Sequence, residues 1–243
     1  MSSLRDELAL GRRELSARSR TSMPRTIQAG ELLAAATASS DAVYHLIAGW
    51  ACQRGDSSYD LRAIADIYVP GDVIGLDAVL GTRPLEYLLP LTSIDIAPIG
   101  TLPDLMTCRS TALYTAWLLG QRQRRADRML AAISNLEARG RLATMLLDFY
   151  RRLSHQKLVT GSTYSLPLTQ TQIGAYLGLT VVHVNRMLRS LRDERIVAFE
   201  KHSVTIINLE RLTRLTQNGR IAPSAAVVEF PTTQEERERI GGS

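Results

Sequence analysis

The stretch QTQIGAYLGLTVVHVNRMLR, residues 170–189, decides the fold of the C-terminal half of the chain. Gly174 is small where two helices would approach each other, and Gly178 falls at the turn between them, where a positive φ favours glycine. Thr169 and Thr180 precede the two helical runs and are good N-caps. The spacing therefore predicts a helix-turn-helix, whose second helix can enter a DNA major groove. Its expected shared core is Ile173, Leu177, Val184 and Met187.

A β-hairpin wing is predicted directly after this helix pair. Residues 196–199 and 204–207 are strand-like runs on either side of a short polar turn. Guanidinium groups on the exposed face of the second helix, about residues 180–192, could reach guanine edges or phosphates, and a purely structural hairpin has little use for them. The sequence therefore predicts a winged helix-turn-helix that binds double-stranded DNA. The arginines on that face are Arg186, Arg189 and Arg192.

Charge is distributed unevenly along the chain. The 243 residues carry a net charge of +5, with 45% hydrophobic and 22% charged side chains. Residues 31–104 contain 3 basic and 10 acidic side chains, whereas residues 105–220 contain 18 basic and 7 acidic ones. Such asymmetry is typical of a protein whose basic part meets a polyanion, and a solvated arginine-rich surface is the alternative.

Residues 25–102 show short strand-like runs separated by glycine and proline. Short strands with this punctuation predict a small antiparallel sandwich or barrel. The runs are residues 43–47, 63–69, 73–74, 85–91 and 94–99.

A long amphipathic helix is predicted over residues 103–136, followed by a second one over 136–154. A helix of about 30 residues is ~45 Å long, more than a small sandwich needs to cover itself. We therefore expect it to pair with a second copy of the chain, and a helix lying on its own domain is the alternative. Its apolar positions include Leu105, Cys108, Ala112, Ala116, Leu119, Ala126, Leu130 and Ile133.

The sequence lacks the patterns of an enzyme or a metal site. GxSxG, P-loop, HExxH and CxxC motifs are absent, and His45 is the only histidine in the β-rich part. We expect no catalytic residue, metal or cofactor, although His45 leaves haem ligation as an alternative to a structural role. Two cysteines exclude a disulfide scaffold and favour the cytoplasm. Cys108 is expected to be a small buried hydrophobe rather than a redox switch.

Membrane insertion is not expected either. No run approaches the ~20 apolar residues needed to span a bilayer, and the charged N-terminus lacks the apolar stretch of a secretory signal.

In combination, these features resemble the Crp/Fnr family of bacterial transcription regulators over about residues 25–215. The strongest match is LTQTQIGAYLGLTVVHVNRMLRSLRDERIV at 168–197. Weaker matches follow the expected order: VYHLIAGWA at 43–51, YVPGDVIGLDAV at 68–79 and RMLAAISNLEARGRLATMLLDF at 128–149. The resemblance implies a homodimer whose two recognition helices read a palindromic operator, with RNA polymerase as a further candidate partner.

The resemblance also implies an α+β fold with five parts. A cyclic-nucleotide-binding-like jelly roll, an antiparallel β-roll, serves as the effector domain, and a C-terminal winged helix-turn-helix binds DNA. The polar residues 1–24 would be a frayed arm or short helix, and the Pro-, Ser- and Thr-containing end would be a flexible tail. The expected boundaries are 1–24 for the arm, 25–102 for the β-roll, 103–136 for the dimerisation helix, 137–215 for the winged helix-turn-helix and 216–243 for the tail.

Departures from the family pattern narrow the choice of effector. Cyclic-nucleotide-binding members carry Gly-Glu and then Arg-Ser or Arg-Thr, whereas this chain has Gly75-Leu76-Asp77 and then Arg83-Pro84. We therefore expect no cyclic AMP binding. An iron-sulfur cluster of the Fnr type needs four thiolates, and the chain has two cysteines. The remaining candidate effector-binding residues are Gly71, Asp72 and Arg83.

The recognition helix also differs from common members of the family, which carry Glu where this chain has Val182 and Arg at the position of Arg186. We expect Arg186 to read guanine, while Asn185 and Val182 shape the neighbouring preference. Arg211 and Arg214 are expected to contact phosphates. A ligand-sensing or interaction module whose helix-turn-helix does not bind DNA is the alternative. The candidate DNA-binding residues are Thr169, Gln170, Thr180, Val181, Val182, His183, Asn185, Arg186, Arg189 and Lys201.

Overall fold

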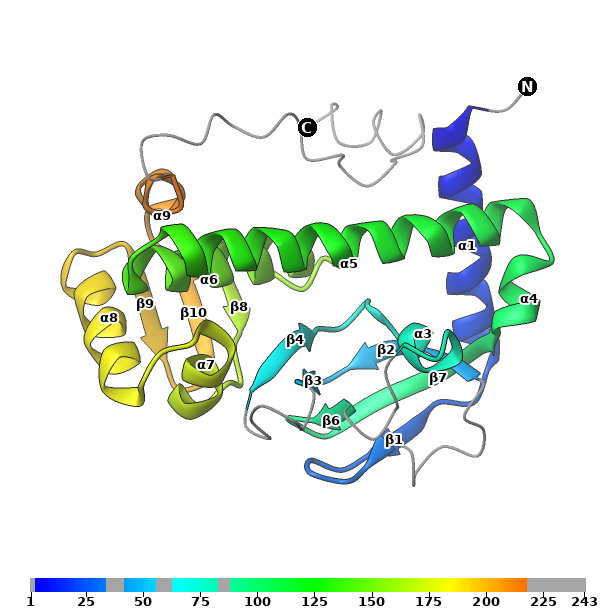
Figure 1. The fold of residues 1–243 in the computed structure, drawn as a ribbon, viewed down its shortest axis with the longest axis horizontal. Coiled ribbons are helices and arrows are strands. Elements are labelled where there is room, and N and C mark those ends of the chain that lie inside the picture. Colours follow the sequence, from blue (N-terminus) through cyan, green and yellow to red (C-terminus); the bar gives the residue numbers. More distant parts are fainter. Residues whose placement is uncertain (1–2, 34–41, 56–62, 83–87, 218–243) are drawn as a thin grey trace.

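The computed structural model describes residues 3–33, 42–55, 63–82 and 88–217. Its N-terminal part is a β-roll of two antiparallel sheets, shown below the long helix in Figure 1. One sheet has the order β1-β7-β2-β5 and the other the order β4-β3-β6. The α+β class with an N-terminal β-roll is thus confirmed. The strands are β1 (Arg25–Ile27), β2 (Ala42–Ala48), β3 (Ala51–Arg54), β4 (Ile64–Tyr68), β5 (Val73–Ile74), β6 (Leu88–Pro90) and β7 (Ile94–Thr101).

Apolar side chains from both sheets fill the β-roll. Leu46 of β2 pairs with Ile96 of β7, and both are fully buried. The short helix α3 (Leu76–Val79) follows β5 and begins at Gly75, whose φ of 90° is left-handed. Two strands, β1 and β3, were not among the runs expected from the sequence. Residues 83–87, which include Arg83, lie outside the described part of the chain.

The N-terminal segment forms an 18-residue helix, α1 (Leu4–Thr21), which crosses α5 (Arg109–Asn135). Its first turn is closed by a capping box between Ser3 and Asp6. A Cβ on Gly11 would lie 2.2 Å from the backbone oxygen of Ser110, so glycine permits the close crossing. The helix packs on the molecule through one face, with Leu8 and Leu15 buried.

The helix expected over 103–136 is interrupted near its start. A short helix, α4 (Leu102–Met106), is capped by Thr101 and Asp104, and α5 begins after an extended residue, Cys108. Cys108 is the N-cap of α5 and is exposed, so the expected burial of this cysteine is wrong. The other cysteine, Cys52, is buried, and burial raises the pKa of its thiol to about 11.

His45 of β2 lies against α1. The distance between its Nδ1 and the Ser19 Oγ is 2.8 Å, and burial lowers the pKa of the imidazole. This contact gives His45 a structural partner across the interface between the β-roll and α1.

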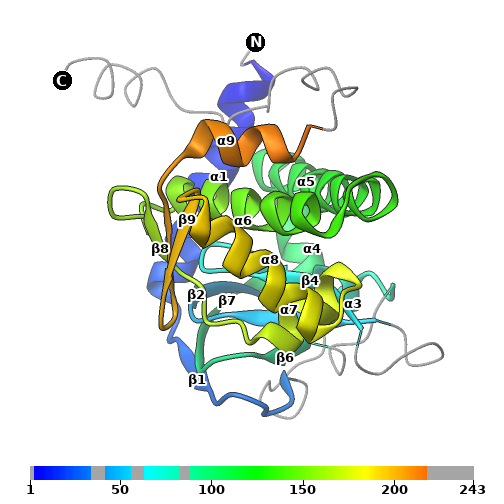
Figure 2. The same ribbon diagram turned by 90° about the vertical axis from the view of Figure 1, so that its left-hand side faces the viewer.

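Helix α6 (Ala138–His155) runs beside α5 and leads into the C-terminal domain, as Figures 1 and 2 both show. That domain contains a three-stranded antiparallel sheet of order β8-β10-β9. Residues 218–243, most of the expected tail, lie outside the described part of the chain. The elements of the domain are β8 (Thr163–Ser165), α7 (Gln170–Leu177), α8 (Val181–Asp193), β9 (Val197–Glu200), β10 (Ser203–Ile206) and α9 (Leu209–Leu215).

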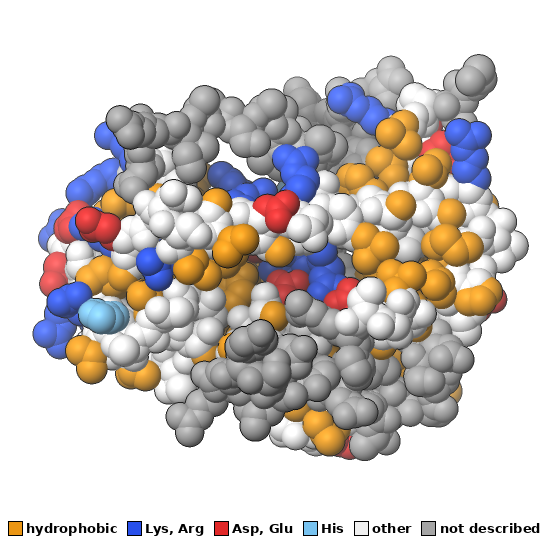
Figure 3. Space-filling model, in the orientation of Figure 1, with side chains coloured by type: hydrophobic (Ala, Val, Ile, Leu, Met, Phe, Trp, Pro, Cys, Tyr) orange, Lys and Arg blue, Asp and Glu red, His pale blue; other side chains and the backbone are white. Residues whose placement is uncertain are grey.

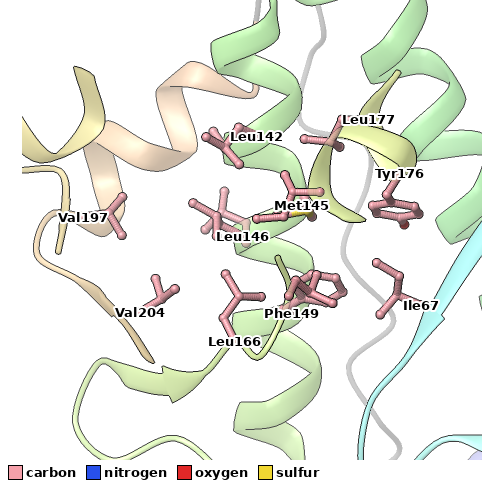
Figure 4. Close-up of a cluster of buried hydrophobic side chains, with 14 of the residues drawn as sticks. Ile67, Leu142, Met145, Leu146, Phe149, Leu166, Tyr176, Leu177, Val197 and Val204 are labelled. Atoms are coloured by element: carbon pink, nitrogen blue, oxygen red, sulfur yellow. The ribbon is translucent and has the colours of Figure 1, made fainter. Parts of the chain in front are cut away.

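One apolar core continues from the β-roll into the C-terminal domain (Figure 4). The rings of Trp50 and Phe149, from the β-roll and α6, meet edge to face with centroids 4.9 Å apart. Ile67 of β4 and Tyr176 of α7 are buried in the same cluster. The C-terminal domain is therefore packed against the β-roll as well as against α6.

Candidate nucleic-acid interface

Local interactions define both helices of the helix-turn-helix. The Thr169 hydroxyl accepts a hydrogen bond from the Gln172 amide, and the Gln172 side chain accepts one from the Thr169 amide, which completes a capping box. Thr180 caps α8 by accepting from the His183 amide. The turn glycine, Gly178, has a φ of 65°, in the left-handed region. These positions agree with the roles expected from the sequence.

The close approach of α7 to the turn depends on a second glycine. A Cβ on Gly174 would lie 2.5 Å from the Leu179 carbonyl oxygen, far inside van der Waals contact. Of the expected shared core, Met187 is partly buried and packs against the cluster, whereas the other members are fully within it: Ile173, Leu177 and Val184.

Helix α8 lies across the face of the domain that Figure 2 turns toward the viewer. Val184, Leu188 and Leu191 point into the core and are buried. Val182 is 77% exposed and points away from this core. Gln170 is half-buried, and the remaining candidate DNA-binding residues are exposed: Thr169, Thr180, Val181, His183, Asn185, Arg186, Arg189 and Lys201.

Part of this set surrounds a groove of about 310 Å³ between α8, the start of α7 and the wing. Asn185 Nδ2 donates to Gln170 Oε1 over 3.3 Å and so joins α8 to α7. Arg189 and Lys201 line the same groove, Lys201 from the wing turn, where its φ is 50°. The structure therefore brings these four residues together. It does not place the others on the groove: Thr169, Thr180, Val181, Val182, His183 and Arg186.

The arginines of this domain fall into two groups. Within the described residues, no carboxylate pairs with the arginines of the α8 face: Arg186, Arg189 and Arg192. In contrast, Arg211 binds Glu194, with 3.0 Å between Nη2 and Oε2, and Arg214 pairs with Glu210. To contact phosphates, as the sequence predicts, Arg211 and Arg214 would have to give up these carboxylate partners. Helix α8 therefore carries positive charge that no carboxylate of the described residues compensates.

A model of the Crp-like helix-turn-helix domain matches residues 140–215. A transcriptional regulatory protein of Bordetella pertussis, btr, is 28% identical over 181 residues, which cover 72% of this chain and 73% of the relative. The fumarate and nitrate reduction regulatory protein of Yersinia pestis is 27% identical over 158 residues, covering 64% and 63%. The C-terminal part of the chain is thus similar to the helix-turn-helix domain of Crp-like regulators, and most of the chain is similar to curated regulatory proteins.

The Crp/Fnr fold also extends beyond the matched domain. FixK2 of Bradyrhizobium japonicum superposes with a TM-score of 0.64 at 24% identity, over 80% of this chain and 97% of that one. This similarity covers the fold as a whole. The chain thus carries a Crp-like helix-turn-helix domain, and the curated relatives named above are regulators rather than enzymes.

Two of the three residues expected to bind an effector lie in the described part of the chain. Gly71 and Asp72 lie in the turn before β5, and Asp72 binds the Arg152 guanidinium. Arg83 is outside the described residues. A separate hollow of about 730 Å³ opens between β4, α3 and α5. In Figure 3, acidic and basic side chains meet below α5 in the middle of the visible face.

A network of ion pairs at this hollow was missed by the sequence reasoning. Arg122 of α5 binds Asp77 of α3 at 2.7 Å and Asp66 of β4 at 3.2 Å, and Arg125 lies 3.4 Å from Asp66. Burial raises the pKa of the Asp66 carboxyl, but Arg125, Arg152 and Arg122 lower it further, so it stays below its usual value. The available signal was Asp66 itself, a single charge within the apolar run 63–69.

No helix among the described residues has both the length and the apolar character to cross a bilayer. Nor do three or more His, Cys, Asp or Glu side chains gather as a metal site would require in the described ranges.

Proposed function

We propose that this regulator is a homodimer that inserts α8, with its N-cap at Thr180, into the major groove of each half of a palindromic operator. The observation that supports it best is the α8 face, where exposed arginines have no carboxylate partner in the described residues. Such groups can bind phosphates and guanine edges without first giving up an internal ion pair. Binding to genomic DNA would place the protein in the cytoplasm.

A partly exposed apolar seam on α5 supports dimerisation. Its members follow one another at intervals of four and then three residues, which is the pattern of a coiled-coil contact. The polar residue Gln123 occupies the middle position of this pattern. Leu130 is 64% exposed, although the opposite face of α5 packs on α1 and the β-roll through Tyr114. Figure 3 shows apolar side chains recurring along α5 on its open face. The α5 seam is Ala112, Ala116, Leu119, Ala126, Leu130 and Ile133.

Two copies related by a two-fold axis along this seam would present two α8 helices to one duplex. Helix-turn-helix dimers place their recognition helices about one DNA turn apart, ~34 Å. The operator is therefore expected to be a palindrome with its half-sites about one turn apart.

We assign distinct roles to the residues of α8. Arg186 reads guanine, and Asn185 contributes a neighbouring adenine preference that its bond to Gln170 helps to orient. Val182 can only pack, for example on a thymine methyl group. His183 lies 3.2 Å from the Thr180 hydroxyl, so it buttresses the start of α8 or a phosphate. Arg189 and Lys201 contact the backbone from the groove beside the wing.

The effector is proposed to be neither cyclic AMP nor an iron-sulfur cluster. The Asp77 carboxylate at the start of α3 is held by Arg122, so this position is already paired within the chain. The two cysteines lie far apart in the fold, Cys52 buried in the β-roll and Cys108 exposed at the start of α5.

Selection of binding sites from random DNA tests the recognition proposal. The wild type should enrich a palindrome, and Arg186→Ala should lose more selectivity than total affinity. Arg124→Ala, an exposed arginine on α5, is the matched control and should enrich the wild-type site. Val182→Glu should change the half-site. If the wild type enriches no sequence, the alternative of an interaction module that does not bind DNA gains support.

Sedimentation of the full chain tests the dimer separately. Leu130→Glu places a charge on the α5 seam and should shift the protein toward monomer. Leu158→Glu alters a leucine that is 47% exposed outside the seam and should leave the oligomeric state unchanged. A monomeric wild type at micromolar concentration would contradict the proposal.

A further inference from the structure

We propose that a cavity between the turn before β5, α5 and α6 binds a small organic carboxylate with one flat apolar group. This α5/α6 cavity has a volume of about 110 Å³. Residues 69–72 form one wall, α5 forms the second and the C-terminal part of α6 forms the third. It is distinct from the hollow at Asp66 and Asp77, which opens on another side of α5.

The position of the cavity on α5 leaves it clear of the dimer proposed above. Successive residues of an α-helix are rotated by about 100°. On this basis Gln121, Arg125 and Arg128, which line the cavity, lie on the side of α5 opposite Leu130 and the rest of the seam. A ligand could therefore enter whether the protein is a monomer or a dimer.

The charge of the lining favours an anion. Four arginines and two aspartates line the cavity, and both aspartates, Asp72 and Asp148, are already bound by Arg152. Arg128 lies at the long distance of 3.5 Å from Asp148. Arg151 also lines the cavity, and it forms no ion pair with a carboxylate of the described residues.

The charge of Arg151 is disfavoured where it stands. Partial burial and the nearby Arg128 guanidinium lower the pKa of Arg151, against a smaller opposing effect of the Asp148 carboxylate. A carboxylate between two guanidinium groups would remove this repulsion and accept forked hydrogen bonds, for which the planar guanidinium is well suited.

The inner part of the cavity is apolar and aromatic. The rings of Tyr114 and Trp117 are stacked, with centroids 5.5 Å apart and planes 15° from parallel, and Leu118 and Val69 complete the wall. An apolar cavity of about 150 Å³ accommodates a benzene molecule. A volume near 110 Å³ that opens at the arginine rim therefore suits a single ring or a short chain, with its carboxylate at the opening.

A ligand in this place would contact three parts of the regulator at once. The turn belongs to the β-roll, Trp117 to the helix proposed to form the dimer, and Arg151 to α6, within the matched Crp-like domain. Binding itself requires neither DNA nor a dimer, so the ligand proposal and the proposed function can fail independently.

Titration of the full chain with benzoate tests this inference. The chain has two tryptophans, so Trp50→Phe leaves Trp117 as the only tryptophan reporter. We expect saturable quenching of Trp117 fluorescence by benzoate, and binding of benzyl alcohol at least about tenfold weaker, because it lacks the charge. Calorimetric titration of the unaltered chain gives the same affinity without relying on the Trp50 substitution.

Substitutions at the rim locate the site. Arg151→Gln and Arg128→Gln should each weaken benzoate binding by about tenfold or more, as expected for a lost charged hydrogen bond. Arg124→Gln, on the same helix but outside the cavity, should bind as the wild type does. Absence of saturable binding, equal affinity for benzoate and benzyl alcohol, or equal effects of Arg124→Gln and Arg151→Gln would each overturn the proposal.

Discussion

Replacing Arg152 by methionine tests the junction between the β-roll and α6. The guanidinium binds the Asp72 and Asp148 carboxylates and donates to the Ile67 carbonyl oxygen over 2.9 Å. Its side chain is 12% exposed, and those of the two aspartates are 16% and 13% exposed. Methionine keeps much of the apolar stem but leaves both carboxylates without this cation. Breaking a buried ion pair from one side costs about 3–5 kcal/mol, so we expect that loss in the free energy of unfolding.

Urea unfolding of the full chain, followed by circular dichroism, measures this loss. Arg214→Met is the matched control, because Arg214 pairs with Glu210 at the same four-residue spacing as Arg152 with Asp148, but with side chains 69% and 75% exposed. Such exposed pairs contribute about 0.3–0.5 kcal/mol. Adding Asp148→Asn to Arg152→Met should recover part of the loss. A deficit below about 1 kcal/mol for Arg152→Met, or equal deficits in the two arginine variants, would refute the reasoning.

Three further predictions concern other parts of the fold. Gly174→Ala should destabilise the protein by about 1–3 kcal/mol in the same unfolding assay, because its Cβ would meet the Leu179 carbonyl oxygen at 2.5 Å; unchanged stability would contradict the close contact. The folded pKa of Asp66 lies below 3.8, so its ionised form stabilises the fold above about pH 4 and this contribution is lost as the pH falls through the folded pKa. The stability gap between wild type and Asp66→Asn should therefore narrow on acidification, and a constant gap would oppose this. At about pH 8, a thiol reagent should label Cys108 and spare Cys52, whose thiol is buried with a pKa of about 11. Mass spectrometry of the labelled peptides measures this, and equal labelling of both cysteines would contradict it.

The helix-turn-helix was predictable because its determinants are local. Thr169, Gly174, Gly178 and Thr180 each act within a few residues of their own position, through a cap, a turn or a close backbone contact. Such local constraints can be predicted from the identity and spacing of the residues alone. The face of α8 follows from the same periodicity, since burial of Val184 determines which side chains remain exposed.

Features that depend on distant contacts were not predictable in the same way. The segment containing α1 is rich in arginine, and nothing within it shows that Gly11 would pack against the backbone of Ser110. Strand β3 contains Cys52 and Gln53 in place of a branched apolar run, and it is defined by its pairing with β4 and β6. Likewise, Arg122 and Asp66 are 56 residues apart and meet only in the folded chain.

The shared core has a consequence for synthesis on the ribosome. Trp50 and Val69 belong to the β-roll, but part of their burial comes from a cluster that includes Phe149. About 80 residues separate Val69 from Phe149, and at about 5–20 residues per second roughly 4–16 s pass before that partner is made. During this interval the nascent β-roll exposes an apolar surface that includes Trp50, one of the two tryptophans of the chain. The emergence of α6 is thus the step that covers this surface, so that chaperones and other nascent chains can no longer bind it.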